Sequence, residues 1–340
     1  MTRPNTHYTG ASGYSSIGSV LAAHLKHDYC VYAFTIYPVT DQKNCRRYQY
    51  QFKYDSFEES SGLGVNVGVL IEKLLDMFGY ELMKKKTSQT KWNIFPENLL
   101  ESTVLDRSRS QAEGDLFEIF KFSDKTHKWH HYFPIYTSRF KRFQDKPVRI
   151  LEIGVQRGGS IEMWRKWFHP ETVIVGLDIN VECMQFDDPE SLTHVRIGDQ
   201  TDTAFLRAVT DEFGSFDIIM DDGGHTTNQM ITSFNALFRY ALTDEGLYMV
   251  EDTHSNYLGK FIDSDVTFVD YSKNMVDLIH EHYVRAGSPK AFRIDLEESS
   301  LFEIEVPYLT AWVDSITFYD SIIAIEKKRR SLPSNECRYN

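Results

Sequence analysis

The stretch from Val148 to Lys328 alternates short apolar runs with segments whose apolar residues recur at helical spacing. Such runs predict buried strands, and the segments between them predict helices that cover the strands. This alternation strongly constrains the fold, because it favours an α/β class with a doubly wound, mostly parallel sheet. The expected strands are VRILEIG (148–154), TVIVGLDI (172–179), THVRIGDQ (193–200), FDIIMDD (216–222) and GLYMVED (246–252). The expected helices are SIEMWRKWF (160–168), TAFLRAV (203–209), the segment with Met230, Phe234, Leu237 and Phe238, and Tyr271–Val284.

The segment SITFYDSIIAIEKK (315–328) contains two further strand patterns, joined by a tight turn near Tyr319 and Asp320. A turn this short cannot make the crossover that parallel strands need, so the two strands must be antiparallel. We therefore expect a C-terminal antiparallel hairpin at the edge of the sheet.

Residues 1–121 lack this alternation. Strand patterns occupy 29–54, and helical periodicity follows at 65–85. We interpret 1–121 as an N-terminal α+β auxiliary domain, 122–329 as the domain that carries the chemistry, and 330–340 as a C-terminal tail.

Composition excludes several classes of protein. The formal net charge of −12 argues against general nucleic-acid binding, which requires a basic surface. No apolar run approaches the roughly 20 residues of a membrane span, and MTRPNTHYTG at the start has no apolar signal core. The four cysteines are far apart and form no CxxC pair, which favours free thiols over disulfides or a zinc site. We expect a soluble cytoplasmic protein with no nucleic-acid or membrane partner.

A glycine-rich turn lies between the first expected strand and its helix, in LEIGVQRGGS (151–160). Glycine at this position lets the backbone approach a ligand closely. The spacing does not match GxGxxG, so it disfavours a dinucleotide. It does match the acidic-x-Gly turn beneath S-adenosylmethionine in Rossmann-like methyltransferases. The turn contributes Glu152, Gly154, Gly158 and Ser160 as candidate cofactor-binding residues.

Further acidic residues follow the next strands in order. Asp178 ends the second strand, where a carboxylate could accept both ribose hydroxyls of such a cofactor. Asp199 or Gln200, after the third strand, could contact the adenine side. Asp221 is included with the cofactor-site residues, although a structural role, in which it supports residues that contact the ligand, is the better interpretation. Each acid alone could be a helix N-cap, but three at successive strand ends favour a ligand site.

Carboxylates also gather after the fourth and fifth strands, at Asp222, Glu251 and Asp252. Mg²⁺ prefers oxygen ligands, and crowded carboxylates repel one another unless a cation neutralises them. We predict that these three residues bind Mg²⁺, with Asp222 also counted as catalytic. His225 would face the same cleft and act as a general base. A lone imidazole with no cysteine nearby disfavours zinc.

The segment SDKTHKWHHYFPIYTSRFKRF (123–143) concentrates Lys, His and aromatic residues just before the first strand of the sheet. Clusters of this kind usually pack in a core. Their position at the mouth of the next domain makes a functional role equally plausible, and the sequence leaves both interpretations open.

Together, LEIGVQRGGS, GLDI, GDQ, DDGGH, EDTHSNY and SITFYDSIIAIEK resemble the magnesium-dependent sugar O-methyltransferases of macrolide biosynthesis, of the mycinamicin type. Cephalosporin-hydroxylase-like proteins share much of this motif set. The resemblance covers about residues 122–328 and implies a Rossmann-like S-adenosylmethionine methyltransferase domain. It implies that Asp222, Glu251 and Asp252 bind the metal, that His225 is the base, and that Glu152, Gly154, Asp178 and Asp199 line the cofactor site. It also implies a homo-oligomer, either a dimer or a tetramer.

The expected function is therefore S-adenosylmethionine- and Mg²⁺-dependent methylation of a sugar hydroxyl on a glycosylated natural product. One alternative is a cephalosporin-hydroxylase-like enzyme that methylates or otherwise modifies another small acceptor. Another is a non-catalytic binding protein, which the carboxylate cluster disfavours because a binding protein has no reason to retain mutually repelling acids.

Overall fold

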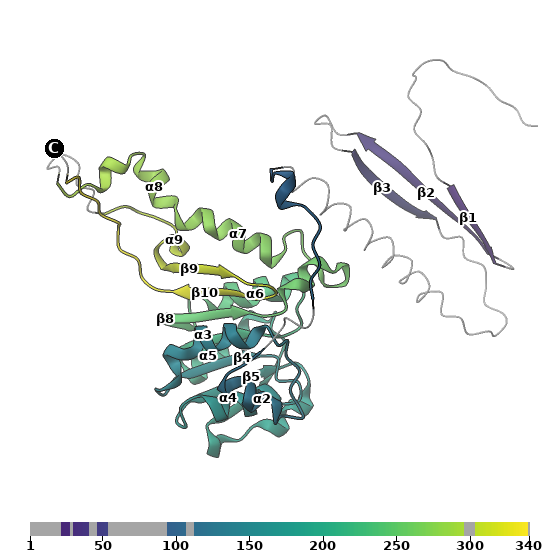
Figure 1. Ribbon diagram of the computed structural model, residues 1–340. Helices are drawn as coiled ribbons and strands as arrows, with labels where there is room; N and C mark the ends of the chain where they lie inside the picture. Colours follow the sequence, from purple (N-terminus) through teal and green to yellow (C-terminus); the bar gives the residue numbers. More distant parts are fainter. Residues whose placement is uncertain are drawn as a thin grey trace, which may run out of the picture. The chain divides into compact units, whose positions relative to one another are not determined.

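The computed structural model describes residues 22–27, 30–40, 46–53, 94–106, 112–295 and 303–338 (Figure 1). The chain falls into two compact units, Met1–Asn66 and Val67–Asn340. The domain boundaries expected at residues 121 and 329 stay predictions.

The first unit contains a three-stranded antiparallel sheet. Its strands are β1 (Ala22–His27), β2 (Cys30–Thr40) and β3 (Arg46–Lys53), with β2 in the centre. The β structure expected at 29–54 is thus confirmed. The helix expected at 65–85 lies outside the described residues.

The second unit is built around a seven-stranded sheet. Its strands are β4 (Arg149–Ile153), β5 (Val173–Asp178), β6 (Thr193–Ile197), β7 (Phe216–Asp221), β8 (Leu242–Val250), β9 (Val313–Phe318) and β10 (Ile323–Lys327). The α-helices are α2 (Asp115–Lys121), α3 (Tyr132–Gln144), α4 (Gly159–Trp167), α5 (Thr203–Phe213), α6 (Thr227–Leu237), α7 (Phe268–Ile279), α8 (Glu281–Ala286) and α9 (Tyr308–Trp312). Short 3-10 turns are η1 (Glu97–Leu99), η3 (Val181–Phe186), η4 (Pro189–Ser191), η5 (Thr253–Tyr257), η6 (Gly259–Phe261) and η7 (Pro289–Phe292).

The order of the sheet is β6-β5-β4-β7-β8-β10-β9. Strands β4 to β8 pair in parallel, whereas β10 pairs antiparallel with both β8 and β9. The parallel sheet with a C-terminal antiparallel hairpin at its edge is confirmed. The chain winds outward from β4 to β6 and then returns to β7 on the other side of β4. Ligands bind outside the carboxyl ends of the strands at such a reversal.

Helices cover both faces of this sheet (Figure 1). Side chains alternate between the faces along each strand. Ile150 and Ile218 pack with α2, α3 and α4, whereas the next residues, Leu151 and Ile219, pack with α5, α6 and α7. This alternation also fixes which face each polar residue near a strand end points to.

The prediction of one helix over Tyr271–Val284 is wrong. The structure has α7 and α8, which are separated at His280 (φ −99°, ψ 0°). The Nδ1 atom of His280 lies 2.9 Å from the carbonyl oxygen of Val276, where it competes with the helical hydrogen bond to that carbonyl. Helix α7 begins earlier than expected because the Thr267 side chain accepts a hydrogen bond from the backbone N–H of Asp270.

Within the described ranges, none of the helices is long and apolar enough to cross a membrane.

Gly154 holds two strand ends close together. It follows β4 with φ +99°, and a Cβ atom there would lie 2.2 Å from the backbone carbonyl oxygen of Asp222.

Gly154→Ala is expected to lower the free energy of unfolding by about 1–3 kcal/mol, measured by urea denaturation. Gly259→Ala is the control, because no atom lies within 4 Å of its added Cβ. Equal stability of the two variants would contradict this packing.

Candidate functional site

A pocket of about 300 Å³ opens at the carboxyl ends of β4, β5, β6, β7 and β8. Five of the predicted cofactor-binding residues line it: Gly154, Ser160, Asp178, Asp199 and Gln200. Asp222, His225 and Asp252 line it as well. The predicted cofactor turn and the predicted acid cluster therefore share one cavity.

Asp178 and Asp199 are positioned by backbone N–H groups. The Asp178 carboxylate accepts hydrogen bonds from the backbone N–H groups of Gln156 (2.9 Å) and Asn180 (2.8 Å). Asp199 Oδ1 accepts hydrogen bonds from the backbone N–H (2.7 Å) and the hydroxyl (2.8 Å) of Thr201. A carboxylate oxygen can accept more than one hydrogen bond, so each acid can still receive a hydroxyl or amine from a ligand.

The Gln200 side chain connects the end of β6 to the loop after β7 by hydrogen bonds. Its side-chain carbonyl accepts a hydrogen bond from the Gly224 N–H (2.9 Å), and its amide donates to Asp221 Oδ1 (3.1 Å) and Ser233 Oγ (3.0 Å). Asp221 is buried and absent from the pocket lining. Burial raises the pKa of Asp221 to about 6, against the hydrogen bonds from Gln200 and the Gly223 N–H. Asp221 therefore contacts the residues that hold this loop, and both its assignment to the cofactor site and its supporting role stay predictions.

Glu152 and Gly158 also lie outside the pocket lining. Glu152 is fully buried on the α3–α4 face of the sheet and accepts a hydrogen bond from Trp164 Nε1 (3.3 Å). Burial raises the pKa of Glu152 to about 7, with Lys128 opposing the rise. Gly158 (φ +72°) is the N-cap of α4 and packs against Phe186. The assignment of these two residues to the cofactor stays a prediction.

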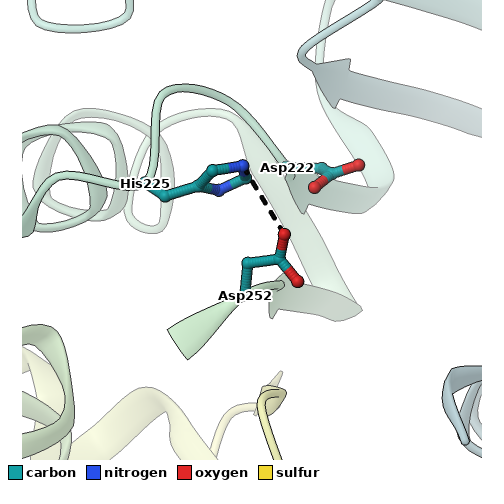
Figure 2. A group of neighbouring side chains, drawn as sticks. All are labelled: Asp222, His225 and Asp252. Atoms are coloured by element: carbon teal, nitrogen blue, oxygen red, sulfur yellow. Dashed lines mark ion pairs between the residues drawn. The ribbon is translucent and has the colours of Figure 1, made fainter. Parts of the chain in front are cut away.

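Asp222, His225 and Asp252 form a compact group of potential metal ligands. One ligand atom from each residue can be chosen so that all lie within 4.8 Å of one another. His225 Nε2 is 3.6 Å from Asp252 Oδ2, and Figure 2 shows the imidazole directed at that carboxylate. All three side chains are partly exposed to the pocket. A ligand can therefore reach all three.

Left-handed backbone and hydrogen bonds fix this geometry. His225 (φ +61°) and Asp252 (φ +52°) are both in the left-handed region, which a non-glycine residue adopts only when its surroundings enforce it. The hydroxyl of Ser255 donates to the carbonyl oxygen of His225 (2.9 Å). The hydroxyl of Tyr132 donates to Asp252 Oδ1 (2.5 Å). A capping box between Thr226 and Gln229 then begins α6.

Lys128 is the principal site residue for which no role was predicted from the sequence. Its Nζ donates to Asp222 Oδ2 (2.5 Å) and Glu251 Oε2 (2.8 Å), and its side chain is only 4% exposed. Burial alone would lower the pKa of Lys128, but the carboxylates of Asp222, Glu251 and Glu152 outweigh it and raise that pKa. In the segment 123–143, Lys125 to Lys128 line the pocket, whereas Tyr136 and Phe140 pack in the core. The packing interpretation is thus confirmed for part of the segment, and a functional role for the rest stays a prediction.

Glu251 lies apart from the group of three and is fully buried against Lys128. Burial and the Asp222 carboxylate raise the pKa of Glu251, whereas Lys128 opposes the rise. Its Oε1 atom has no hydrogen-bond partner among the described residues. Its prediction as a metal ligand therefore remains a prediction, with one oxygen still available for that role.

The residues present fit a divalent cation. The carboxylates of Asp222 and Asp252 and the imidazole of His225 converge at the pocket, and carboxylate oxygens together with an imidazole nitrogen are ligands that divalent cations accept. The residues also fit a nucleoside-type ligand. The pocket combines a close-packed glycine turn with carboxylates at two successive strand ends, and its volume is at the lower end of the usual range for ligand sites.

The chain is similar in sequence to several O-methyltransferases. It is 32% identical over 215 residues to 8-demethyl-8-(2-methoxy-alpha-L-rhamnosyl)-tetracenomycin-C 3'-O-methyltransferase of Streptomyces olivaceus, covering 59% of this chain and 54% of that protein. It is 37% identical over 147 residues to mycinamicin VI 2''-O-methyltransferase of Micromonospora griseorubida, covering 40% of this chain and 35% of that protein. The chain spans about half the length, or less, of the curated relatives it matches. No family model matches it.

Among solved structures, the chain is similar to the MycE methyltransferase from the mycinamycin biosynthetic pathway in complex with Mg and SAH. The TM-score is 0.53 at 29% identity, over 66% of this chain and 57% of that one. The fold is thus that of the Rossmann-like S-adenosylmethionine methyltransferases. Within that class, the chain is related to the sugar O-methyltransferases of macrolide and polyketide biosynthesis, which confirms the resemblance found from the motifs.

Removal of the Lys128 charge tests its role in the buried cluster. Lys128→Met is expected to lower the free energy of unfolding by about 3–5 kcal/mol, because it leaves buried carboxylates without their cation. Lys125→Met is the matched control. It breaks an exposed ion pair with Glu162 (44% exposed on both sides), which solvent screens, so it contributes little to stability. Urea denaturation measures both, and a Lys128 variant as stable as the control would refute the structural role.

Proposed function

We propose that the protein is an S-adenosylmethionine- and Mg²⁺-dependent O-methyltransferase that acts on a sugar hydroxyl of a glycosylated natural product. The observation that carries the proposal is the convergence of Asp222, His225 and Asp252 within 4.8 Å, in the same pocket as the glycine turn at Gly154. The names of the relatives support the acceptor class, because they include methyltransferases of rhamnosyl tetracenomycin and of mycinamicin.

We assign the two halves of the reaction to two groups of residues that line the cavity. The turn at Gly154, with Ser160 and Asp178, would hold the methyl donor, and Asp222 with Asp252 would hold the metal. When bound, S-adenosylmethionine supplies an electrophilic methyl group, and Mg²⁺ lowers the pKa of a hydroxyl that it contacts. Holding both reactants in one cavity supplies much of the rate enhancement, since it replaces a bimolecular encounter by a fixed geometry.

His225 is the proposed general base. His225 lines the cavity, and its Nε2 would accept the proton of the acceptor hydroxyl. The hydroxyl oxygen would then bond to the methyl carbon as the carbon–sulfur bond breaks, and S-adenosylhomocysteine would leave. The Asp252 carboxylate, 3.6 Å away, would stabilise the imidazolium that forms. Lys125 to Lys128 line the cavity beside these residues, and Lys128 donates a hydrogen bond to Asp222.

The group of three could also use His225 as a metal ligand, and one variant separates the two roles. His225→Ala is expected to lower methyl transfer by about 10²–10⁴-fold. As a base, His225 should be dispensable for the metal, so the affinity for Mn²⁺, measured by electron paramagnetic resonance as a probe of the Mg²⁺ site, should stay within about twofold. His169→Ala, outside the pocket lining, serves as the control with full activity. A tenfold or larger loss of Mn²⁺ affinity would make His225 a ligand.

The metal itself is tested by removal and by mutation. Chelation with EDTA should abolish methyl transfer, and added Mg²⁺ should restore it. Asp252→Asn should weaken Mn²⁺ binding by about tenfold or more, because it removes a ligand charge. Asp244→Asn, whose side chain is 65% exposed, should leave binding unchanged. Full turnover in EDTA would contradict the metal role.

Two further parts of the proposal rest on the family relationship. The protein is expected to form a dimer or tetramer, which light scattering would measure. The cephalosporin-hydroxylase-like alternative is separated by the mass of the product, since methyl transfer adds a single methyl group.

A further inference from the structure

A partly exposed tryptophan lies beside the acid cluster. Trp129 is 49% exposed, whereas Trp164 and Trp167 are 0% and 6% exposed. An indole is among the largest apolar side chains, so leaving it half in water forgoes much of the stabilisation that burial would give. An exposed indole held at a reaction site is a common means of binding a ligand with an apolar face.

The neighbouring residues Lys128 and Tyr132 fix the backbone of Trp129 in place. Lys128, the preceding residue, is held by Asp222 and Glu251. Tyr132 donates its backbone N–H to the Trp129 carbonyl oxygen (3.1 Å) and its hydroxyl to Asp252. The indole is therefore carried by a segment that is bonded at both ends to the acid cluster, and it cannot move away without breaking those bonds.

The rings beside Trp129 connect it to the proposed metal ligand. The indole centroid lies 5.8 Å from the His254 ring, in an edge-on arrangement, and 5.9 Å from the His131 ring. His254 Nδ1 lies 3.8 Å from Asp252 Oδ1. One imidazole thus lies between the indole and the Asp252 carboxylate, and the three rings form an aromatic wall next to, but not part of, the lining of the cavity.

This wall fits a pyranose ring. One face of such a ring presents C–H groups, which pack against an aromatic face, while its hydroxyls project from the rim. A sugar lying on the indole would extend its rim hydroxyls past His254 toward Asp252 and Asp222. The apolar face and the polar rim of the sugar would then each meet matching protein groups.

We propose that Trp129, flanked by His254 and His131, is the platform on which the acceptor sugar lies, and that it determines which glycosides the enzyme accepts. The proposal deepens the proposed function and rests on it for the identity of the reacting group. Trp129 is a specificity-determining residue and takes no part in proton transfer.

Binding without turnover tests the platform directly. The probe is methyl α-L-rhamnopyranoside, observed by saturation-transfer difference NMR in the presence of S-adenosylhomocysteine and Mg²⁺. Saturation is expected to reach the C–H protons of the sugar ring, to fall at least fivefold in Trp129→Ala, and to be largely retained in Trp129→Phe, which keeps an aromatic face. Tyr240→Ala is the control, because Tyr240 is 63% exposed and lies just before β8, at the opposite end of that strand from the pocket. No saturation in the wild-type protein, or equal saturation in Trp129→Ala, would overturn the platform.

Kinetics distinguish failure of the platform from failure of the proposed function. With 8-demethyl-8-α-L-rhamnosyl tetracenomycin C as acceptor, Trp129→Ala should raise KM by about tenfold and leave the affinity for S-adenosylhomocysteine unchanged. Methyl transfer with an unchanged KM in Trp129→Ala would overturn the platform and leave the proposed function standing. Sugar binding that depends on Trp129, without transfer of a methyl group to any glycoside tested, would overturn the function and leave the platform standing.

Discussion

The buried ammonium of Lys128 is the interaction on which the site depends. It joins Asp222, at the end of β7, to Glu251, at the end of β8, and donates a hydrogen bond to each carboxylate. Glu251 is fully buried, and an isolated buried charge costs several kcal/mol, so this cation offsets the cost of placing an acid at that strand end. The same lysine fixes the segment before α3, and with it the neighbouring residues Trp129 and Tyr132. One ion-pair network thus stabilises the fold and positions the walls of the cavity.

The fold of residues 148–328 was largely predictable, because buried parallel strands give apolar runs and covering helices give amphipathic ones. The order of the elements and the antiparallel hairpin at the edge follow from that pattern and from the short turn near Tyr319. The break at His280 was missed, because an imidazole that competes for the Val276 carbonyl leaves no mark in hydrophobic periodicity. The boundary of the N-terminal region stays a prediction.

The chemical character of the site was predictable from the sequence, but the roles of its individual acids were less so. Acids at strand ends indicated the cavity, and Asp222, His225 and Asp252 do converge there. Glu152 and Glu251 point to the α3–α4 face of the sheet, as the alternation of side chains along a strand could have indicated. There Glu251 forms an ion pair with Lys128, and Glu152 interacts with it electrostatically. The pattern along the strands could not identify Lys128 as the partner of these acids, because Lys128 is 94 residues from Asp222 and 123 residues from Glu251 along the chain. The expectation that clustered carboxylates require a cation was sound, and a lysine supplies part of that charge.

The most direct test of this account is a crystal structure with S-adenosylhomocysteine and Mn²⁺, with the metal located by its anomalous signal. We expect one strong peak within ligand distance of the Asp222 and Asp252 carboxylates, with S-adenosylhomocysteine above the turn at Gly154 and its ribose at Asp178. S-adenosylhomocysteine in that pocket with no metal at Asp222 and Asp252, or with the metal at another place, would contradict it.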